Sequence, residues 1–268
     1  MTQWQRAVKY IAMALAILLA VTIIFGIVSA VSSLGLLFGD DSSLIGEMKE
    51  DVVSGEVSRL DVELEGASLK IKSGEEFLVE SNLKNLSVRV SGGTLSVVQE
   101  HIAFTSVGSS ASVIIYIPEG TVFDKASIET GAGKLDIDTL SAEYVDLDLG
   151  AGQVNIGTLN ASEGADIDGG AGQVNIRGGE LCKLDLDMGV GEFNLRARLS
   201  GRNTFDMGIG AANVTLIGSP DDYCFDISKG LGDAKINGES VGSGKHGSGD
   251  TYVQIDGGIG SITVNTEG

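Results

Sequence analysis

Several residue types are scarce in this 268-residue chain, which has two cysteines, two prolines, two histidines and 5% aromatic residues. Two cysteines, Cys182 and Cys224, cannot build a disulfide scaffold, so a continuous core must hold the fold together. His101 and His246 accompany no recognisable nucleophile motif, so no hydrolase triad is visible. The Gly-x-Gly strings lack a following helix and an acidic ribose partner, which excludes a dinucleotide site. The sequence therefore predicts a protein that is not an enzyme and needs no cofactor.

Basic residues are also scarce, with 18 Lys and Arg against 37 Asp and Glu. The first 39 residues contain two basic residues and no acidic one, so the remainder has 16 basic and 37 acidic residues, a formal charge of −21. Such a surface repels nucleic acid and anionic lipid, and it is compatible with cations, basic peptides or neutral glycans. We therefore expect a protein or glycan partner and no nucleic acid.

One long apolar run is present, over residues 10–38. About 20 apolar residues suffice to cross a bilayer core, so the run predicts a transmembrane anchor within residues 1–39. Two basic residues precede it and two aspartates follow, which places the N-terminus in the cytoplasm and residues 40–268 outside. The expected location is the cell membrane, as a single-pass protein. The alternative is a cleaved signal peptide with its cleavage site at residues 28–30.

The chain beyond the anchor divides into three parts by composition. Residues 40–56 are polar and predict a stalk, with a short helix capped by Ser42 or Ser43. Residues 57–125 predict irregular β-rich coils, in which segments 65–71 and 91–97 loosely match a Gly-x-Gly corner. Residues 126–268 predict regular Gly-x-Gly repeats.

An internal repeat decides the expected fold. Seven copies of a Gly-apolar-Gly motif follow one another at intervals of 19, 20, 19, 19, 22 and 28 residues. The copies are GAGKLDI (131–137), GAGQVNI (150–156), GAGQVNI (170–176), GVGEFNL (189–195), GIGAANV (208–214), GLGDAKI (230–236) and GIGSITV (258–264). Units of this size cannot bury an apolar face alone, so they must stack. The prediction is an all-β parallel β-solenoid (β-helix) of about 19–20-residue coils, preceded by one transmembrane helix.

Strictly alternating segments such as VDLDL (145–149) precede the repeat motifs. This period is that of a half-buried strand, with Leu147 inward and Asp148 outward. The alternation shifts phase at Gly152, which marks a corner because glycine supplies the dihedral freedom of a sharp bend. We expect the apolar middle residue of each motif to fill the corner from inside. The Gly/Ser-rich segment 238–250 predicts a flexible hairpin or surface loop, and residues 260–268 predict a final coil with an exposed edge.

Stacked coils would bring like side chains into columns. The first, here called the Asp row, consists of Asp148, Asp168, Asp187, Asp206 and Asp256, with Asp226 nearby and Asp146, Asp166 and Asp185 forming a second, partial column. Carboxylates at the strand spacing of about 4.8 Å repel one another and would favour bound cations or raised pKa values. Asp148, Asp168, Asp187 and Asp206 are therefore a candidate cation ladder, for which Ca²⁺ is the best metal. The alternative is a solvated negative face that discourages edge-to-edge association.

Two further columns carry structural expectations. The Asn row, which consists of Asn155, Asn175, Asn194 and Asn213, predicts a hydrogen-bonded ladder of side-chain amides. Cys182 and Cys224 are expected two coils apart, about 9–10 Å along the axis, as separate and largely buried thiols.

The segment SVIIYIPEGTVFDKASIETGAGKLDI (112–137) resembles bacterial putative-adhesin domains of the LiaG-like group. In that family a strand ending in proline leads into a glycine-cornered solenoid array, and the resemblance covers residues 57–266 and the N-terminal anchor. It implies a membrane-attached surface protein, sometimes linked with envelope-stress signalling, and it supplies no catalytic or ligand residues.

Three functions follow from these features. The first is a surface structural, adhesive or binding module, and the second is an accessory regulator of envelope stress that acts through a membrane partner. The third is an enzyme acting on cell-wall glycan, which the absence of a clustered site disfavours.

Overall fold

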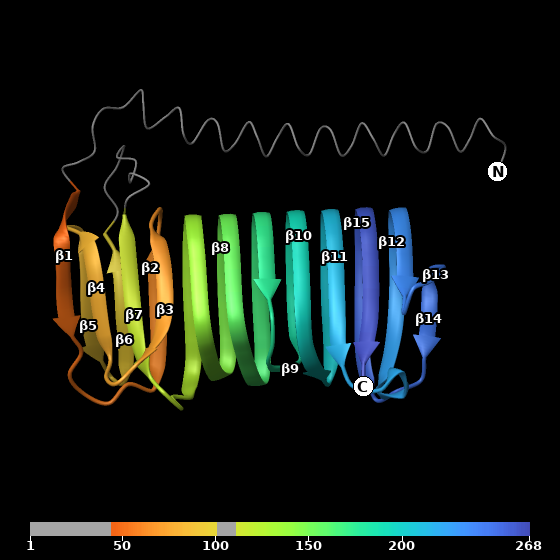
Figure 1. The fold of residues 1–268 in the computed structure, drawn as a ribbon, viewed down its shortest axis with the longest axis horizontal. Helices are drawn as coiled ribbons and strands as arrows, with labels where there is room; N and C mark the ends of the chain where they lie inside the picture. The colour runs from red at the N-terminus through yellow and green to blue at the C-terminus, as the bar shows by residue number, and fades with distance from the viewer. Residues whose placement is uncertain (1–43, 101–110) are drawn as a thin grey trace, which may run out of the picture.

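The computed structural model describes residues 44–100 and 111–268, which form an all-β, solenoid-like array (Figure 1). Within these residues there is no α-helix, and one 3₁₀ helix, η2, spans Pro220–Asp222. The described part of the chain contains no helix long and apolar enough to cross a membrane. The predicted span at residues 10–38 lies outside the described residues, as do Ser42 and Ser43.

All the strands belong to one continuous hydrogen-bonded system. They are β1 (Ile45–Val52), β2 (Arg59–Leu64), β3 (Ser68–Gly74), β4 (Leu78–Leu83), β5 (Leu86–Ser91), β6 (Thr94–Gln99), β7 (Ser112–Pro118), β8 (Phe123–Ile176), β9 (Glu180–Cys182), β10 (Leu184–Ser200), β11 (Arg202–Ile217), β12 (Tyr223–Ile236), β13 (Glu239–Val241), β14 (Gly244–Gly247) and β15 (Thr251–Glu267).

The longest strand, β8, has 54 residues and would measure about 180 Å if it were straight. Instead it folds back on itself several times, and its turns appear as neighbouring parallel rungs (Figure 1). The next rungs, β10 and β11, pair in parallel with Asp185 opposite Thr204 and Leu195 opposite Val214, a shift of 19 residues. Successive repeats therefore stack in register, as the interval between the glycine motifs predicts.

Each straight segment of a solenoid turn contributes apolar side chains to the core. Leu147 and Leu149 point inward before the corner, Val154 and Ile156 point inward after it, and Leu159 follows on the next segment. These side chains belong to a single hydrophobic cluster that runs the length of the array. Burial of each such aliphatic side chain contributes about 1.5–3 kcal/mol, so stacking supplies the stability that one repeat lacks.

Glycine is required at the corners for two reasons. Gly152 has a φ of 148°, a backbone conformation that residues other than glycine rarely adopt. A Cβ atom added there would meet the carbonyl oxygen of Gly133 in the preceding turn, and one at Gly172 would meet the carbonyl oxygen of Gly152. The corners stack so closely that only backbone fits between them.

The expectation that the middle residue of each motif fills the corner from inside is wrong. Ala151 is half-buried, and Leu231, which holds the same place in a later motif, is 52% exposed. Leu149 and Val154, on either side of the corner, are both almost fully buried. These flanking side chains fill the interior of the bend, so the middle residue points outward.

The C-terminal strand does not form an exposed final edge, contrary to the sequence-based expectation. β15 lies between β11 and β12, with Asp206 opposite Asp256 on one side and Ile227 opposite Ile255 on the other (Figure 1). β12 is therefore the last full turn. The segment 238–250, expected to be a flexible hairpin or a surface loop, contains β13 and β14, which pair antiparallel with β12 and cover part of its outer edge.

The N-terminal end shows the same arrangement. β2 lies between β6 and β8, and β3 lies between β7 and β8, so the first turn of the described chain is enclosed by a later one. Antiparallel strands β4 and β5 then cover β7 and β6. Residues 65–71 do lie at a corner, because a Cβ atom at Gly133 would meet the carbonyl oxygen of Ala67. Residues 91–97 do not, because Gly92 and Gly93 form the turn of the β5–β6 hairpin.

The predicted stalk helix is also wrong. Residues 45–52 form the edge strand β1, which pairs antiparallel with β4 and is mostly exposed. Backbone hydrogen bonds to β4 hold this polar segment, and no apolar helical face is needed.

Candidate binding surfaces

The Asp row is assembled as predicted. In the register of the parallel strands, Asp168 lies opposite Asp187, Asp187 opposite Asp206, and Asp206 opposite Asp256. Each of these strands presents apolar side chains inward at alternate positions, which turns the carboxylates to the outside. Asp226 lies outside the row, because its strand places it opposite Gln254, and its carboxylate accepts a hydrogen bond of 2.7 Å from the Tyr252 hydroxyl.

Partial burial and neighbouring charges raise the pKa of several aspartates on this face. Partial burial raises the pKa of Asp168, and the neighbouring charges of Asp187 and Asp148 raise it further. The pKa of Asp166 is raised in the same way by burial and then by Asp168 and Asp185. Burial and the charge of Asp256 raise the pKa of Asp206. The row thus stores electrostatic repulsion that a proton or a cation would relieve.

No compact metal centre is found on this face. Across the described ranges, no group of three or more His, Cys, Asp or Glu side chains comes close enough together to hold a metal ion. Asp146 is already paired, because its carboxylate lies 2.8 Å from the Lys125 ammonium. Ca²⁺ binding along Asp148, Asp168, Asp187 and Asp206 stays a prediction.

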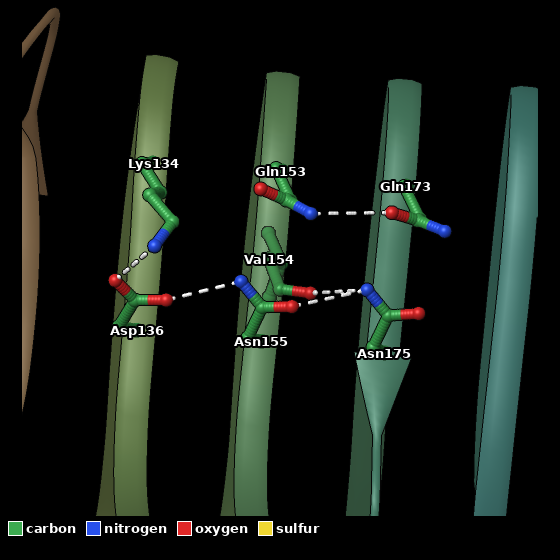
Figure 2. A network of polar contacts seen from close by, with 7 residues as sticks. All are labelled: Lys134, Asp136, Gln153, Val154, Asn155, Gln173 and Asn175. Atoms are coloured by element: carbon green, nitrogen blue, oxygen red, sulfur yellow. Dashed lines mark hydrogen bonds and ion pairs between the residues drawn. The ribbon is translucent and has the colours of Figure 1, made fainter.

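The Asn row forms a hydrogen-bonded ladder, as predicted. The side-chain nitrogen of Asn175 donates to Asn155 at 3.1 Å, Asn194 donates to Asn175 at 2.8 Å, and Asn213 donates to Asn194 at 2.9 Å. Figure 2 shows the first rungs, where Asn155 donates at 3.0 Å to Asp136. Lys134 donates to the same carboxylate at 2.7 Å. Every amide points in one direction, so Asp136 supplies the acceptor that ends the row.

A second amide ladder runs alongside, in which Gln153 donates to Gln173 at 3.2 Å (Figure 2). Gln173 in turn donates to Glu192 at 3.1 Å. Partial burial opposes ionisation of Asp136, but the hydrogen bonds from Lys134 and Asn155 outweigh it and lower its pKa. These contacts use the outward amides for structure, so this face offers few unsatisfied groups to a ligand.

The cysteines are separate thiols, but their placement differs from the prediction. Cys182 lies opposite Ser200, and Cys224 lies opposite Tyr252, which in turn lies opposite Arg202. Three strand spacings, about 14 Å, therefore separate them, well beyond the limit of about 7 Å for a disulfide. Insertion of β15 adds the third spacing. Both are free and half-buried, not largely buried as expected.

His246 contacts the carbonyl oxygen of Gly242 at 3.0 Å, and His101 lies outside the described residues. In the part of the chain that the structure describes, no hydrogen bond joins His246 to a serine or cysteine.

A shallow groove of about 410 Å³ lies beside the second aspartate column and was not predicted from the sequence. Tyr144, 50% exposed, stands at its rim. Its lining includes Lys125, Asp146, Asp166, Lys183 and Asp185. The position of Tyr144 between two acidic repeats gave no signal, because an isolated aromatic residue on a strand is indistinguishable from a core residue until its direction is known.

A partly exposed line of apolar side chains, here called the apolar ridge, runs along the glycine corners. Val190 lies opposite both Ala171 and Ile209, and Ile259 lies opposite both Ile209 and Leu231. The ridge consists of Ala132, Ala151, Ala171, Val190, Ile209, Ile259 and Leu231, all of them half-buried except the more exposed Leu231.

The stacked turns, glycine corners and outward ladders define a Toastrack-type β array. The model of the Toastrack DUF4097 family matches residues 57–267, and the chain belongs to this family. This finding supports the resemblance to adhesin-like domains drawn from residues 112–137.

The solved structures that match this chain share little sequence with it. A putative adhesin from Bacteroides fragilis has 13% identity and a TM-score of 0.48, with 81% of this chain and 96% of that chain covered. A putative cell adhesion protein from Clostridium sporogenes has 16% identity and a TM-score of 0.36, with coverages of 82% and 99%. A putative lipid binding protein from Parabacteroides distasonis has 11% identity and a TM-score of 0.33, with coverages of 83% and 96%. No curated protein matches the chain.

Proposed function

We propose that this protein is a membrane-anchored, extracytoplasmic binding module whose β-solenoid of about 19–20-residue coils serves as a surface structural or adhesive element. Residues 10–38 would anchor it, with the described array outside the cytoplasm. Its partner would be a protein or a glycan at the cell surface, and catalysis would play no part.

The groove at Tyr144 is the observation that carries this proposal. An exposed ring can stack on a sugar or an apolar side chain, and adjacent carboxylates can accept hydrogen bonds from hydroxyl or ammonium groups. The ring of Tyr144 lies close to Gly164, at 3.3 Å from the position of an added Cβ atom. The ring therefore lies against the backbone at Gly164, while half of its surface stays open to solvent and available for stacking.

The fold supports the same function. Parallel strands bonded on both sides hold each outward side chain at a fixed spacing, so the array presents a rigid surface and loses little conformational entropy on binding. Rigidity of this kind suits a binding module that acts through contact alone.

The test is affinity capture of envelope components on the purified full chain, comparing wild type with Tyr144→Ala and with the control Val122→Ala. Val122 is 64% exposed and lies outside the groove. We expect Tyr144→Ala to weaken retention of a specific glycan or protein about tenfold or more, as for loss of an aromatic contact worth about 1.5–2 kcal/mol. Equal retention by all three proteins would refute the groove as the binding site.

The captured partner also separates the two binding roles. Wall glycan or a surface protein would support adhesion, whereas an integral membrane signalling protein would favour the accessory regulator. The anchor is tested separately by alkaline extraction of membranes, which releases peripheral proteins and retains a chain that spans the bilayer.

A further inference from the structure

We propose that the apolar ridge faces a lipid bilayer and that its C-terminal end inserts into the membrane interface, so the array lies lengthwise along the membrane. This inference rests on the proposed anchoring by residues 10–38 and adds an orientation and a second lipid contact to it.

The first observation is the ridge itself. The solvent-facing sides of the strands carry aspartate, asparagine or glutamine, whereas the middle residue of each of the seven Gly-x-Gly motifs is apolar. Neighbouring ridge residues are one strand spacing apart, so the seven residues form a line about 29 Å long. Leu231 is the most exposed of them, at 52%. A continuous line of partly exposed apolar side chains that ends in an exposed leucine is a candidate contact surface.

The second observation is where the chain enters the array. Ala67 stacks against the corner glycine Gly133, so it lies on the edge of the array that carries the ridge. β3 starts at the next residue, Ser68, and therefore begins at this edge. β7 runs parallel to β3 and therefore also begins there. β4 is antiparallel to β7, so Leu83 returns to the same edge, and Ile45 of β1 lies opposite Leu83. The chain that follows the apolar run thus joins the array on the edge that carries the ridge.

The linker is short. Residue 38 ends the apolar run and β1 begins at Ile45, seven residues later. At no more than about 3.3–3.6 Å per residue, these residues span about 25 Å at most. A chain anchored by residues 10–38 is therefore held with its ridge edge close to the bilayer surface.

The side chains of the ridge change along its length. Alanine occupies the three positions nearest the N-terminal end, and Val190, Ile209, Ile259 and Leu231 occupy the other end. The covalent anchor holds the first end at the membrane without any further contact. The distal end needs affinity of its own, and larger aliphatic side chains provide it by burial at the interface.

A second copy of the chain is a weaker candidate for this surface. The ridge is one residue wide, so two ridges in contact would bury far less than the about 800 Å² per partner typical of stable interfaces. The acidic surface also repels anionic lipid, so the bilayer that fits is rich in neutral or zwitterionic lipids.

The experiment uses the full chain reconstituted into phosphatidylcholine vesicles, with Cys182 and Cys224 replaced by serine. A fluorescent probe is attached at Leu231→Cys, and its quenching by brominated phosphatidylcholine is measured. Two control positions, each replaced by cysteine, lie on the opposite edge of the array. Val122 (Val122→Cys) follows the end of β7 that is far from the ridge. Glu239 (Glu239→Cys) lies opposite Ile236, the last residue of β12. The first control matches the aliphatic character and the second matches the position along the array.

We expect quenching at position 231 to be at least about twofold stronger than at either control, because interfacial side chains reach about 5–10 Å into the headgroup and acyl boundary. The double variant Ile209→Asp, Ile259→Asp should lower it to the control level, whereas Val122→Asp should not. Circular dichroism confirms that each variant keeps its β structure.

Three results would overturn the inference. Equal quenching at all three positions in chains that float with the vesicles would refute the ridge contact while leaving the anchor intact. Failure of the chain to float would refute both the anchor and the inference. Shielding of the probe from an aqueous quencher at high protein density, without quenching by lipid, would show that a second copy covers the ridge.

Discussion

The Asp168→Asn substitution tests the electrostatics of the Asp row. It removes one negative charge from the middle of a row of carboxylates and replaces it by an amide of nearly the same shape. Asp168 lies opposite Asp187, and its pKa responds to both Asp187 and Asp148. We expect the variant to be more stable than wild type at neutral pH.

The magnitude follows from the strand spacing. Two unit charges about 5 Å apart repel by about 0.8 kcal/mol in water, so two neighbours contribute about 1.7 kcal/mol without salt. At physiological ionic strength the Debye length is about 8 Å, which reduces the total to about 0.9 kcal/mol. In 1 M salt the gain falls to about 0.3 kcal/mol.

Urea unfolding at low and high salt measures both values, with Glu119→Gln as a control that removes an exposed charge outside the row. The control should change the free energy of unfolding by less than about 0.5 kcal/mol. If the variant is less stable than wild type, and if adding Ca²⁺ widens that difference in the free energy of unfolding, the repulsion is refuted and the row holds a cation.

The same row determines a pH dependence. The pKa values of Asp166, Asp168 and Asp206 are raised in the folded state above their ordinary value of 3.8, by burial first and then by neighbouring carboxylates. Their stabilising effect is fully present below the ordinary pKa and is lost as pH rises through the raised values. Asp136 has a lowered pKa, so its contribution is present above 3.8 and lost as pH falls through the lowered value. Stability should therefore rise on acidification from pH 7 towards about 4 and fall below that. Asp168→Asn should flatten the rise, and a variant with an unchanged profile would contradict the assignment.

Three further outcomes are expected. Asn175→Ala should lower the free energy of unfolding by about 1–2 kcal/mol, because it removes one hydrogen bond from the half-buried amide on each side, and Asn213→Ala at the end of the row should cost about half as much. Equal costs in urea unfolding would contradict the ladder. Gly210→Ala should cost about 2–4 kcal/mol, since Gly210 has φ of 148° and the new Cβ atom would meet the carbonyl oxygen of Gly191. Gly242→Ala, with nothing within 4 Å of an added Cβ atom, should cost less than about 0.5 kcal/mol, and similar melting temperatures for the two would refute the packing argument. When the folded protein is mildly oxidised, then unfolded and treated with a thiol reagent, both Cys182 and Cys224 should react with the reagent. Recovery of an intramolecular disulfide would contradict their separation.

Much of the array could be predicted from the sequence. The alternation at residues 145–149 gives the inward and outward sides of a strand, and the constant interval between glycine motifs gives the register that assembles the Asp row and the Asn row. Both follow from local periodicity, which depends only on backbone geometry. The direction of the corner residue could not be predicted, because it depends on whether Leu149 and Val154 already fill the bend, which is a matter of packing volume.

The groove at Tyr144 and the pairing of Asp226 required the three-dimensional arrangement for a different reason. Each depends on which strand lies next to which, and the residues on either side of Tyr144 or Asp226 do not reveal that order. Asp226 follows Asp206 by 20 residues, as in the Asp row, but it lies four residues before Gly230, whereas Asp206 lies two residues before Gly208. The register that aligns the glycine motifs therefore places Asp226 opposite Gln254.

The order of the last strands did leave a trace in the sequence, in the lengths of the final two intervals. Consecutive neighbours need only a step of one strand spacing, about 4.8 Å, and the intervals of 19 or 20 residues supply it. β12 must skip one place to leave room for β15, and its interval of 22 residues includes the 3₁₀ helix Pro220–Asp222, which spans the larger gap. The following interval of 28 residues contains β13 and β14, so the chain covers the outer edge of β12 before it returns as β15. A parallel array that simply stopped would leave a full strand edge unpaired and prone to association, and placing the final turn inside leaves shorter antiparallel strands at the end instead. Because the N-terminal turn is enclosed in the same way, the two irregular ends of the repeat reflect a single physical requirement, protection of open β edges, and long terminal intervals in related arrays should indicate inserted strands.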